Sequence, residues 1–174
     1  MTEPGPSATD PGPAAGGHGD GASALAPSTT GPDAWPFSHS DEVRFSDLDM
    51  LGHLNNVAFL VFLESARVAY IRTTLPSGEP LIPAGFGVVV AETRIGYRFP
   101  GQLGERIETL LRPDEVGRSS LRLDFEMRVG DRVIADGHSI MVYYDRAAER
   151  PAPLPDLLRA RLLADGARER TRAA

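Results

Sequence analysis

Residues 44–67 read RFSDLDMLGHLNNVAFLVFLESAR, a polar turn that runs into an apolar segment. The apolar segment follows Asn55 and Asn56, and asparagine is a favoured helix N-cap because its side-chain oxygen accepts an otherwise unpaired backbone N–H. Residues 57–63 would be apolar on every side of a helix, which is typical of a helix that is buried nearly all round. The sequence therefore predicts one buried central helix over residues 57–75.

Alternating apolar and polar residues predict strands on both sides of this helix. One short strand precedes it, and four strands with short links, which suit antiparallel pairing, follow it. A ferredoxin-like fold would need a second core helix between the strands. We therefore expect the α+β class, with an antiparallel curved sheet wrapped around one central helix. The predicted strands are 40–47, 86–99, 105–112, 119–129 and 133–144.

The two ends of the sequence differ from this central part. Residues 1–36 contain seven Gly, seven Pro and no Arg. Such a segment cannot bury enough apolar surface to offset its chain entropy, so we interpret it as a disordered tail whose role the sequence does not give. Residues 156–172 predict a C-terminal helix. The expected folded domain thus spans residues 37–174.

Length and composition limit the function. The 174 residues suit one domain. The chain has no cysteine and no lysine, which excludes disulfides, a cysteine nucleophile and lysine Schiff-base chemistry. A net charge of -6 argues against nucleic acid as the main partner. Without a membrane span or a secretory signal in the sequence, we expect a cytoplasmic protein with no membrane or nucleic-acid partner.

The polar turn concentrates groups that suit acyl transfer. A helix N-terminus presents free N–H groups and a positive dipole end, which can stabilise an oxyanion. A carboxylate beside it, such as Asp49, can act as a nucleophile or as a general base for water. Gly52 would let the backbone approach a ligand closely. Taken singly, Asp49, His53 and the two asparagines also fit structural roles as a turn acid, a satisfied histidine and helix caps.

Together with the strands downstream, this turn resembles the 4-hydroxybenzoyl-CoA thioesterase-like branch of the hotdog superfamily. Its members show a D-x-D-x-x-G-H-x-N-N element that leads into an aromatic helix ending near E-x-A-R. The resemblance covers about 120 residues, from 38 to 158. It implies a hotdog fold and an acyl-CoA thioesterase. The matching residues are Asp47, Asp49, Gly52, His53, Asn55, Asn56, Glu64, Ala66 and Arg67.

The resemblance also implies roles for individual residues. Asp49 matches the catalytic carboxylate, and a backbone N–H near Asn56 is expected to bind the thioester carbonyl. His53 and Asn55 would shape the pocket or orient water, while Asp47 would hold the loop. Another hotdog branch uses a glutamate on the central helix, so Glu64 is the rival catalytic acid. Arg67 lies three residues beyond Glu64 and can pair with it at helical spacing.

Substrate binding and assembly follow from the same resemblance. Ser119 and Ser120 match a region near the thioester or the pantetheine arm, and Arg118 is one candidate for a contact with a CoA phosphate. Hotdog domains usually form dimers with active sites at the interface, so we expect a homodimer or homotetramer. We expect no cofactor beyond the CoA or pantetheine of the substrate. We also expect no metal, because no cysteine and no second nearby histidine supports the loop acids as ligands.

Three functions remain in competition. The first is hydrolysis of an acyl-CoA or acyl-carrier-protein thioester. The second is an enoyl-thioester hydratase, for which the usual D-x-N-x-x-H pattern is absent. The third is a non-catalytic acyl-CoA sensor, which the fold alone does not exclude. Val57, Phe59, Leu60 and residues 88–90 are expected to supply apolar walls, but the identity of the acyl chain and the choice between nucleophile and base stay open.

Overall fold

One sheet and one long helix make up most of the structure, a computed structural model that describes residues 35–74 and 85–170. The predicted tail, apart from its last two residues, lies outside these ranges. The elements are β1 (Phe37–Glu42), the 3-10 helix η1 (Phe45–Asp47), α1 (Asn56–Thr73), β2 (Phe86–Tyr97), β3 (Arg106–Val116), β4 (Ser120–Val129), β5 (Arg132–Asp145), β6 (Arg150–Pro151), α2 (Asp156–Ala164) and β7 (Arg168–Glu169). All neighbouring long strands pair antiparallel, and the sheet order is β1-β3-β4-β5-β2, with β6 paired to β5 and β7 to β3.

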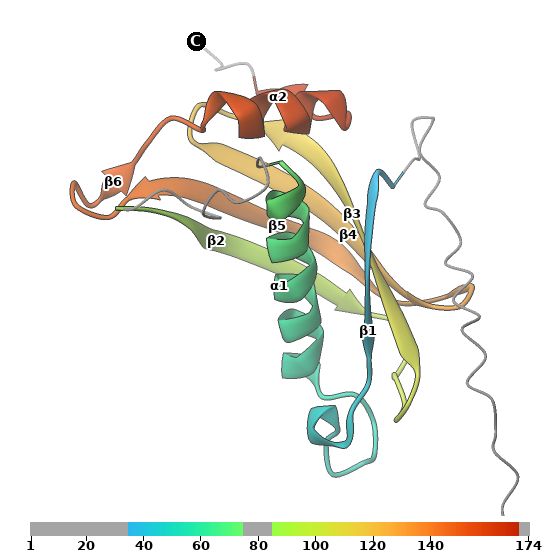
Figure 1. The fold of residues 1–174 in the computed structure, drawn as a ribbon. Coiled ribbons are helices and arrows are strands. Elements are labelled where there is room, and N and C mark those ends of the chain that lie inside the picture. Colours follow the sequence, from blue (N-terminus) through green and yellow to red (C-terminus); the bar gives the residue numbers. More distant parts are fainter. Residues whose placement is uncertain (1–34, 75–84, 171–174) are drawn as a thin grey trace, which may run out of the picture.

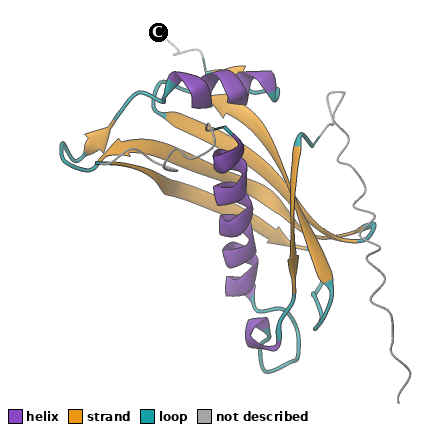
Figure 2. Ribbon diagram, viewed as in Figure 1, coloured by secondary structure: helices purple, strands orange, loops and turns teal. Residues whose placement is uncertain are grey.

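Helix α1 runs across the concave face of the curved sheet, and the strands bend around it (Figure 1). Colouring by secondary structure separates the single central helix from the sheet behind it and from the short α2 at one end (Figure 2). This arrangement confirms the predicted α+β hotdog fold. Its core forms because one side of α1 and the inner face of the sheet bury their apolar side chains against each other.

The core is built from helical spacing on α1 and from alternate residues on the strands. Phe62 and Leu63 are almost inaccessible to solvent, and each fully buried side chain of this size stabilises the fold by about 1.5–3 kcal/mol. The same cluster contains every second residue along most of β4. Its members include Phe59, Ala66, Tyr70, Ile107, Leu111, Leu121, Leu123, Phe125, Met127 and Ile134.

The prediction that the helix is buried all round is wrong within one chain. Val57 and Val61 are 59% and 47% exposed, because the sheet covers only one side of α1. A second exposed apolar surface lies on β2, one of the two edge strands, where Val89 and Val90 are 45% and 48% exposed. Both surfaces leave large apolar side chains exposed in the part of the chain that the structure describes.

The first strand lies earlier in the sequence than predicted. It ends at Glu42, and the last three residues of the predicted strand form η1 instead. The physical reason is a local cap, since the Asp47 carboxylate accepts hydrogen bonds from the backbone N–H and the guanidinium of Arg44 at 2.9 and 3.1 Å. This closed turn stops the strand and directs the chain toward α1.

Two other elements differ in length from their predictions. The predicted 105–112 strand continues as β3 through Pro113, where the pairing with β4 shifts register, because proline lacks the N–H that a regular ladder needs. The C-terminal helix was predicted to continue to residue 172, but α2 ends at Ala164. Gly166 then adopts a φ of +104°, a conformation that favours glycine, and β7 pairs in parallel with β3.

Helix α2 is attached to the central helix by a partly buried hydrogen bond. The Tyr70 hydroxyl donates to the Asp165 carboxylate at 2.7 Å, and Arg161 donates to the same carboxylate at 2.7 Å. Burial, together with this carboxylate, raises the pKa of Tyr70, so the phenol stays protonated and remains a donor. Neither α1 nor α2 is long and apolar enough to cross a membrane.

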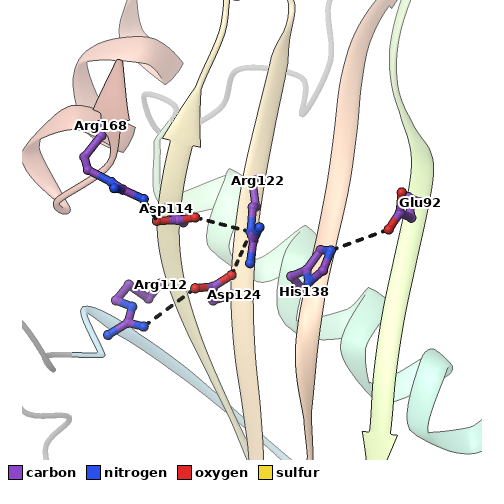
Figure 3. A network of polar contacts seen from close by, with 7 residues as sticks. All are labelled: Glu92, Arg112, Asp114, Arg122, Asp124, His138 and Arg168. Carbon is purple, nitrogen blue, oxygen red and sulfur yellow. Dashed lines mark hydrogen bonds and ion pairs between the residues drawn. The ribbon is translucent and has the colours of Figure 1, made fainter. Parts of the chain in front are cut away.

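The outer face of the sheet carries charged side chains that pair across the strands (Figure 3). Arg122 lies 3.3 Å from Asp114 and 3.0 Å from Asp124, and Arg168 binds Asp114 at 2.7 Å. In this view α1 lies behind the sheet, so the network faces away from the core. Half-exposed ion pairs of this kind contribute about 0–1 kcal/mol each to stability.

Thr109 offers a test of the core. Its side chain is fully buried, and its hydroxyl has no hydrogen-bond partner among the residues that the structure describes. Thr109→Val keeps the shape and removes the unpaired hydroxyl, so we expect the free energy of unfolding to rise by about 1 kcal/mol in urea titrations. Ser139→Ala is the matched control, since the Ser139 hydroxyl accepts from Arg67 at 3.0 Å, and it should destabilise. A destabilised Thr109→Val would contradict this account.

Candidate active site

A pocket of about 420 Å³ opens where the start of α1 meets the end of β2. One wall comes from the polar turn and the first turn of α1. The other comes from Tyr97 and the three residues that follow β2. The complete lining is Asp49, His53, Leu54, Asn56, Phe59, Tyr97, Arg98, Phe99 and Pro100.

The turn that carries Asp49 is closed by its own hydrogen bonds. The Asp49 N–H donates to the His53 carbonyl at 2.8 Å, and the Gly52 N–H donates to the Asp49 carbonyl at 3.0 Å. Gly52 adopts a φ of +74°, which favours glycine at this position. One carboxylate oxygen of Asp49, Oδ1, accepts from the Leu51 and His53 N–H groups at 2.8 and 3.2 Å. The turn therefore orients the Asp49 side chain through its backbone donors.

The second carboxylate oxygen of Asp49 is not engaged in this way. Oδ2 accepts no hydrogen bond from any residue in the described ranges 35–74 and 85–170. The side chain is exposed and lines the pocket. A carboxylate held by one oxygen and free at the other is suited to attack a carbonyl carbon or to accept a proton from water.

Asp47, the other acid of the turn, lies in a different environment. Its side chain is only 11% exposed and is paired with Arg44, and its carbonyl accepts from the Asn55 N–H at 2.8 Å. Burial raises the pKa of the Asp47 carboxyl, but the hydrogen bonds and the charge of Arg44 outweigh this effect, and the net pKa is lowered. Asp47 thus stays ionised and joins η1 to the helix start.

The start of α1 supplies hydrogen-bond donors to the pocket. Asn55 is the N-cap, and its side-chain oxygen accepts from the Val57 N–H at 2.9 Å. Its carbonyl accepts from the Ala58 N–H at 2.9 Å. Asn56 is the first helical residue, so its own N–H has no acceptor within the helix. A free N–H at the positive end of the helix dipole can stabilise negative charge that develops on a carbonyl oxygen.

Three of the four predicted catalytic residues meet at this pocket. Asp49, His53 and Asn56 line it, while Gly52 and Asn55 lie in the same turn and hold its shape. Glu64 does not line it. It lies eight residues after Asn56, about 12 Å along the helix axis, and is exposed.

The predicted partner of Glu64 is engaged elsewhere. Arg67 is 9% exposed and donates to the Ser139 hydroxyl at 3.0 Å rather than forming a close ion pair with Glu64. Burial lowers the pKa of Arg67, and the charge of Glu64 opposes that effect without reversing it. Glu64 therefore keeps an exposed carboxylate on α1, away from the pocket.

The predicted substrate-binding residues on β4 lie at the far end of the sheet within one chain. Tyr97 lies beside Ala135 on β5, and Ala135 lies beside Met127 on β4. Ser120 is seven residues from Met127, or about 23 Å along the strand. Arg118 and Ser119 lie in the hairpin just before Ser120. A single chain thus does not bring these three residues to the pocket.

The interpretation of the sequence missed one wall of the pocket. Phe59 was expected to be apolar lining and does line it, but Tyr97, Arg98, Phe99 and Pro100 were not assigned to the site. Strand alternation had placed Tyr97 and Phe99 on one face, and Pro100 marks the strand end. That signal indicates an aromatic strand end but does not say what it faces.

In the parts of the chain that are described, no group of three or more His, Asp or Glu side chains could hold a metal ion. The expectation that no metal takes part therefore stays a prediction. The chemistry that the site offers comes from a carboxylate, an imidazole and backbone N–H groups.

Residues 43–162 match the thioesterase-like superfamily. The fold is similar to a thioesterase from Thermus thermophilus solved in complex with coenzyme A and Zn, with 36% identity, a TM-score of 0.65, and coverage of 75% of this chain and 93% of that one. It is also similar to the PA2801 protein of Pseudomonas aeruginosa, with 30% identity, a TM-score of 0.66, and coverage of 72% and 96%.

Two further similarities are more distant. A 1,4-dihydroxy-2-naphthoyl-CoA thioesterase from Synechocystis shares the fold, with 19% identity, a TM-score of 0.67, and coverage of 73% of this chain and 95% of that one. The YsmA protein of Bacillus subtilis is 29% identical over 92 residues, or 53% of this chain. The matched region spans 60% of the length of that curated relative.

Proposed function

Since the chain belongs to the thioesterase-like superfamily, we propose that it hydrolyses an acyl thioester to a free acid and a thiol, with Asp49 as the central carboxylate. One observation carries this proposal. The free Oδ2 of Asp49 and the N–H of Asn56, which has no acceptor within its helix, belong to residues that line the same pocket. Acyl transfer needs these two groups together, one to deliver an oxygen and one to stabilise the oxyanion.

The reaction can follow either of two routes at this site. In the nucleophilic route, Asp49 attacks the thioester carbon, the C–S bond breaks to release the thiolate, and water hydrolyses the resulting anhydride. In the general-base route, Asp49 takes a proton from water, the hydroxide attacks the carbon, and the departing thiolate is protonated. In both routes the Asn56 N–H stabilises the carbonyl oxygen as it gains negative charge.

The remaining turn residues act around this centre in our proposal. His53 lines the pocket and would orient the attacking water. Gly52 and Asn55 would hold the turn and the helix start in place. Glu64, the rival acid, lies outside the pocket, so we assign the central role to Asp49.

The thiol part of the substrate is proposed to be coenzyme A or the pantetheine arm of an acyl-carrier protein. The Thermus thermophilus thioesterase, 36% identical to this chain, was solved with coenzyme A bound. The aromatic wall of Phe59, Tyr97 and Phe99 would face the acyl group. No cofactor is needed in this scheme, because CoA enters as part of the substrate.

We propose that the active protein is at least a homodimer joined through β2. This strand of 12 residues is one of the two edges of the sheet, and it carries the exposed Val89 and Val90. An exposed apolar edge is a ready template for pairing with another chain. Two β2 edges related by a two-fold axis would run antiparallel. The start of β4 is level with Val89, near the beginning of β2. In an antiparallel pair, the beginning of the partner's β2 lies beside the Tyr97 end of this one. Such pairing would therefore bring residues 118–120 of the partner subunit toward the pocket.

Val61→Glu tests whether the exposed side of α1 takes part in this assembly. Val61 is half exposed in the single chain, so the substitution should spare the fold, whereas a buried carboxylate at a subunit interface is costly. We expect the dissociation constant of the dimer to rise at least about tenfold in sedimentation equilibrium. Leu163→Glu, on the exposed side of α2, is the control and should not change assembly. A monomeric wild type would refute the proposed dimer, and an unaltered dimer in Val61→Glu would show that the exposed side of α1 lies outside its interface.

The proposed reaction is tested by thiol release from a panel of short, long, branched and aromatic acyl-CoAs and acyl-carrier proteins. The chain has no cysteine and therefore adds no background to a colorimetric thiol reagent. We expect turnover with at least one acyl group, which would identify the substrate class. Acyl-CoA binding without thiol release from any substrate would instead favour a binding protein, and water addition to an enoyl-CoA would favour a hydratase.

A further inference from the structure

Tyr97 joins the end of the edge strand to the start of the central helix. Its ring packs edge-on against Phe59, with the centroids 5.2 Å apart and the planes at 72°. Its hydroxyl donates to the Asn56 carbonyl at 3.3 Å. The side chain is 47% exposed and forms part of the pocket wall. The phenol thus contacts Asn56, the residue whose own N–H has no acceptor within the helix.

The hydrogen bond acts on the peptide unit between Asn56 and Val57. The carbonyl of this unit accepts from Tyr97, and its N–H donates to the Asn55 side chain at 2.9 Å. The peptide unit before it is held as well, because the Asn55 carbonyl accepts from the Ala58 N–H. The Asn56 N–H therefore lies between two anchored groups, at a helix end that would otherwise fray readily.

We propose that Tyr97 is a positioning residue, whose hydroxyl fixes the first turn of α1 so that the Asn56 N–H meets the thioester oxygen. This inference rests on the proposed thioesterase function. It assigns Tyr97 no contact with the reacting atoms, since its hydroxyl acts through Asn56. An oxyanion donor contributes to the rate only when it is aligned with the oxygen in the transition state, so the loss of alignment lowers kcat.

Tyr97→Phe isolates this effect, because it removes the hydroxyl and keeps the ring on Phe59. We expect kcat for thiol release to fall about tenfold while KM stays within about twofold. Tyr70→Phe is the matched control, since it also removes a donating phenol, but at the contact with α2. It should lower Tm by about 3–6 °C and leave kcat unchanged.

Three outcomes would overturn the proposal. If Tyr97→Phe keeps the wild-type kcat, the ring packing alone matters and the hydroxyl has no positioning role. If KM rises while kcat stays the same, the phenol contacts the substrate in the ground state instead. If the fall in kcat of Tyr97→Phe is explained by partial unfolding, seen as a lower Tm, the tyrosine has only a structural role and the proposal also fails.

Amide hydrogen exchange gives a readout that needs no turnover. We expect the Val57 amide to exchange faster in Tyr97→Phe than in the wild type, and to be unchanged in Tyr70→Phe. Equal exchange in all three proteins would overturn the positioning role even if the enzyme is active. If the wild type releases no thiol but exchange still rises in Tyr97→Phe, the proposed function fails while the anchoring of the helix start by Tyr97 stands.

Discussion

Asp49→Asn is expected to lower kcat for thioester hydrolysis by about 10²–10⁴-fold, whichever of the two routes operates. An amide can neither form the anhydride nor take a proton from water. The turn should survive the change, because the Asn side-chain oxygen can still accept from the N–H groups of Leu51 and His53. The measurement is thiol release at saturating acyl-CoA, with circular dichroism and Tm as checks on the fold.

Glu64→Gln is the matched control for Asp49→Asn. It makes the same change from carboxylate to amide, but on an exposed residue outside the pocket. We expect its kcat to stay within about threefold of the wild type, since the site chemistry is left intact. The opposite pattern, with Asp49→Asn active and Glu64→Gln inactive, would move the catalytic role to the central helix.

Gly137→Ala is expected to destabilise the fold by about 3 kcal/mol or more. A Cβ at Gly137 would lie 1.9 Å from the Arg94 carbonyl oxygen and 3.0 Å from the ring of Phe125. The first of these atoms belongs to the backbone of β2, so relief requires movement of the strand rather than of a side chain. Gly137 pairs with Ile95 of β2, and Ile95 lies two residues before Tyr97. A movement of β2 should therefore also displace the pocket wall that Tyr97 forms.

Urea titration and thermal unfolding measure this loss, and Gly87→Ala provides the control. Gly87 lies in the same pair of strands, but a Cβ there would meet only the Arg146 side chain at 3.9 Å. We expect its free energy of unfolding to change by less than about 1 kcal/mol. Equal stability of the two variants would show that β2 can move away from β5 without cost.

Local patterns were enough for the main elements of the fold. The apolar run after Asn55 indicated the central helix, and the period of two indicated the four strands after it, because both periods reflect which side chains a neighbour can bury. Boundaries were less predictable. The cap between Arg44 and Asp47, the register shift at Pro113 and the positive φ of Gly166 each depend on contacts that alternation does not encode.

The candidate site divides in the same way. Asp49, His53 and Asn56 lie within eight residues, so a turn followed by a helix brings them together whatever the rest of the fold does. Tyr97 lies about forty residues further along the chain. Its contacts with Phe59 and Asn56 arise only because β2 closes the sheet edge beside the start of α1.

The sequence by itself determined the central helix, the strand order along the chain and the carboxylate turn at the helix start, because these follow from local periodicity, capping and spacing. The tertiary structure alone decided which side of α1 is exposed in the described part of the chain, which strands form the edges of the sheet and which aromatic residues complete the pocket. It also placed residues 118–120 about 23 Å from the pocket within one chain. These properties depend on strand pairing between distant segments, and side-chain periodicity carries no information about which strands become neighbours.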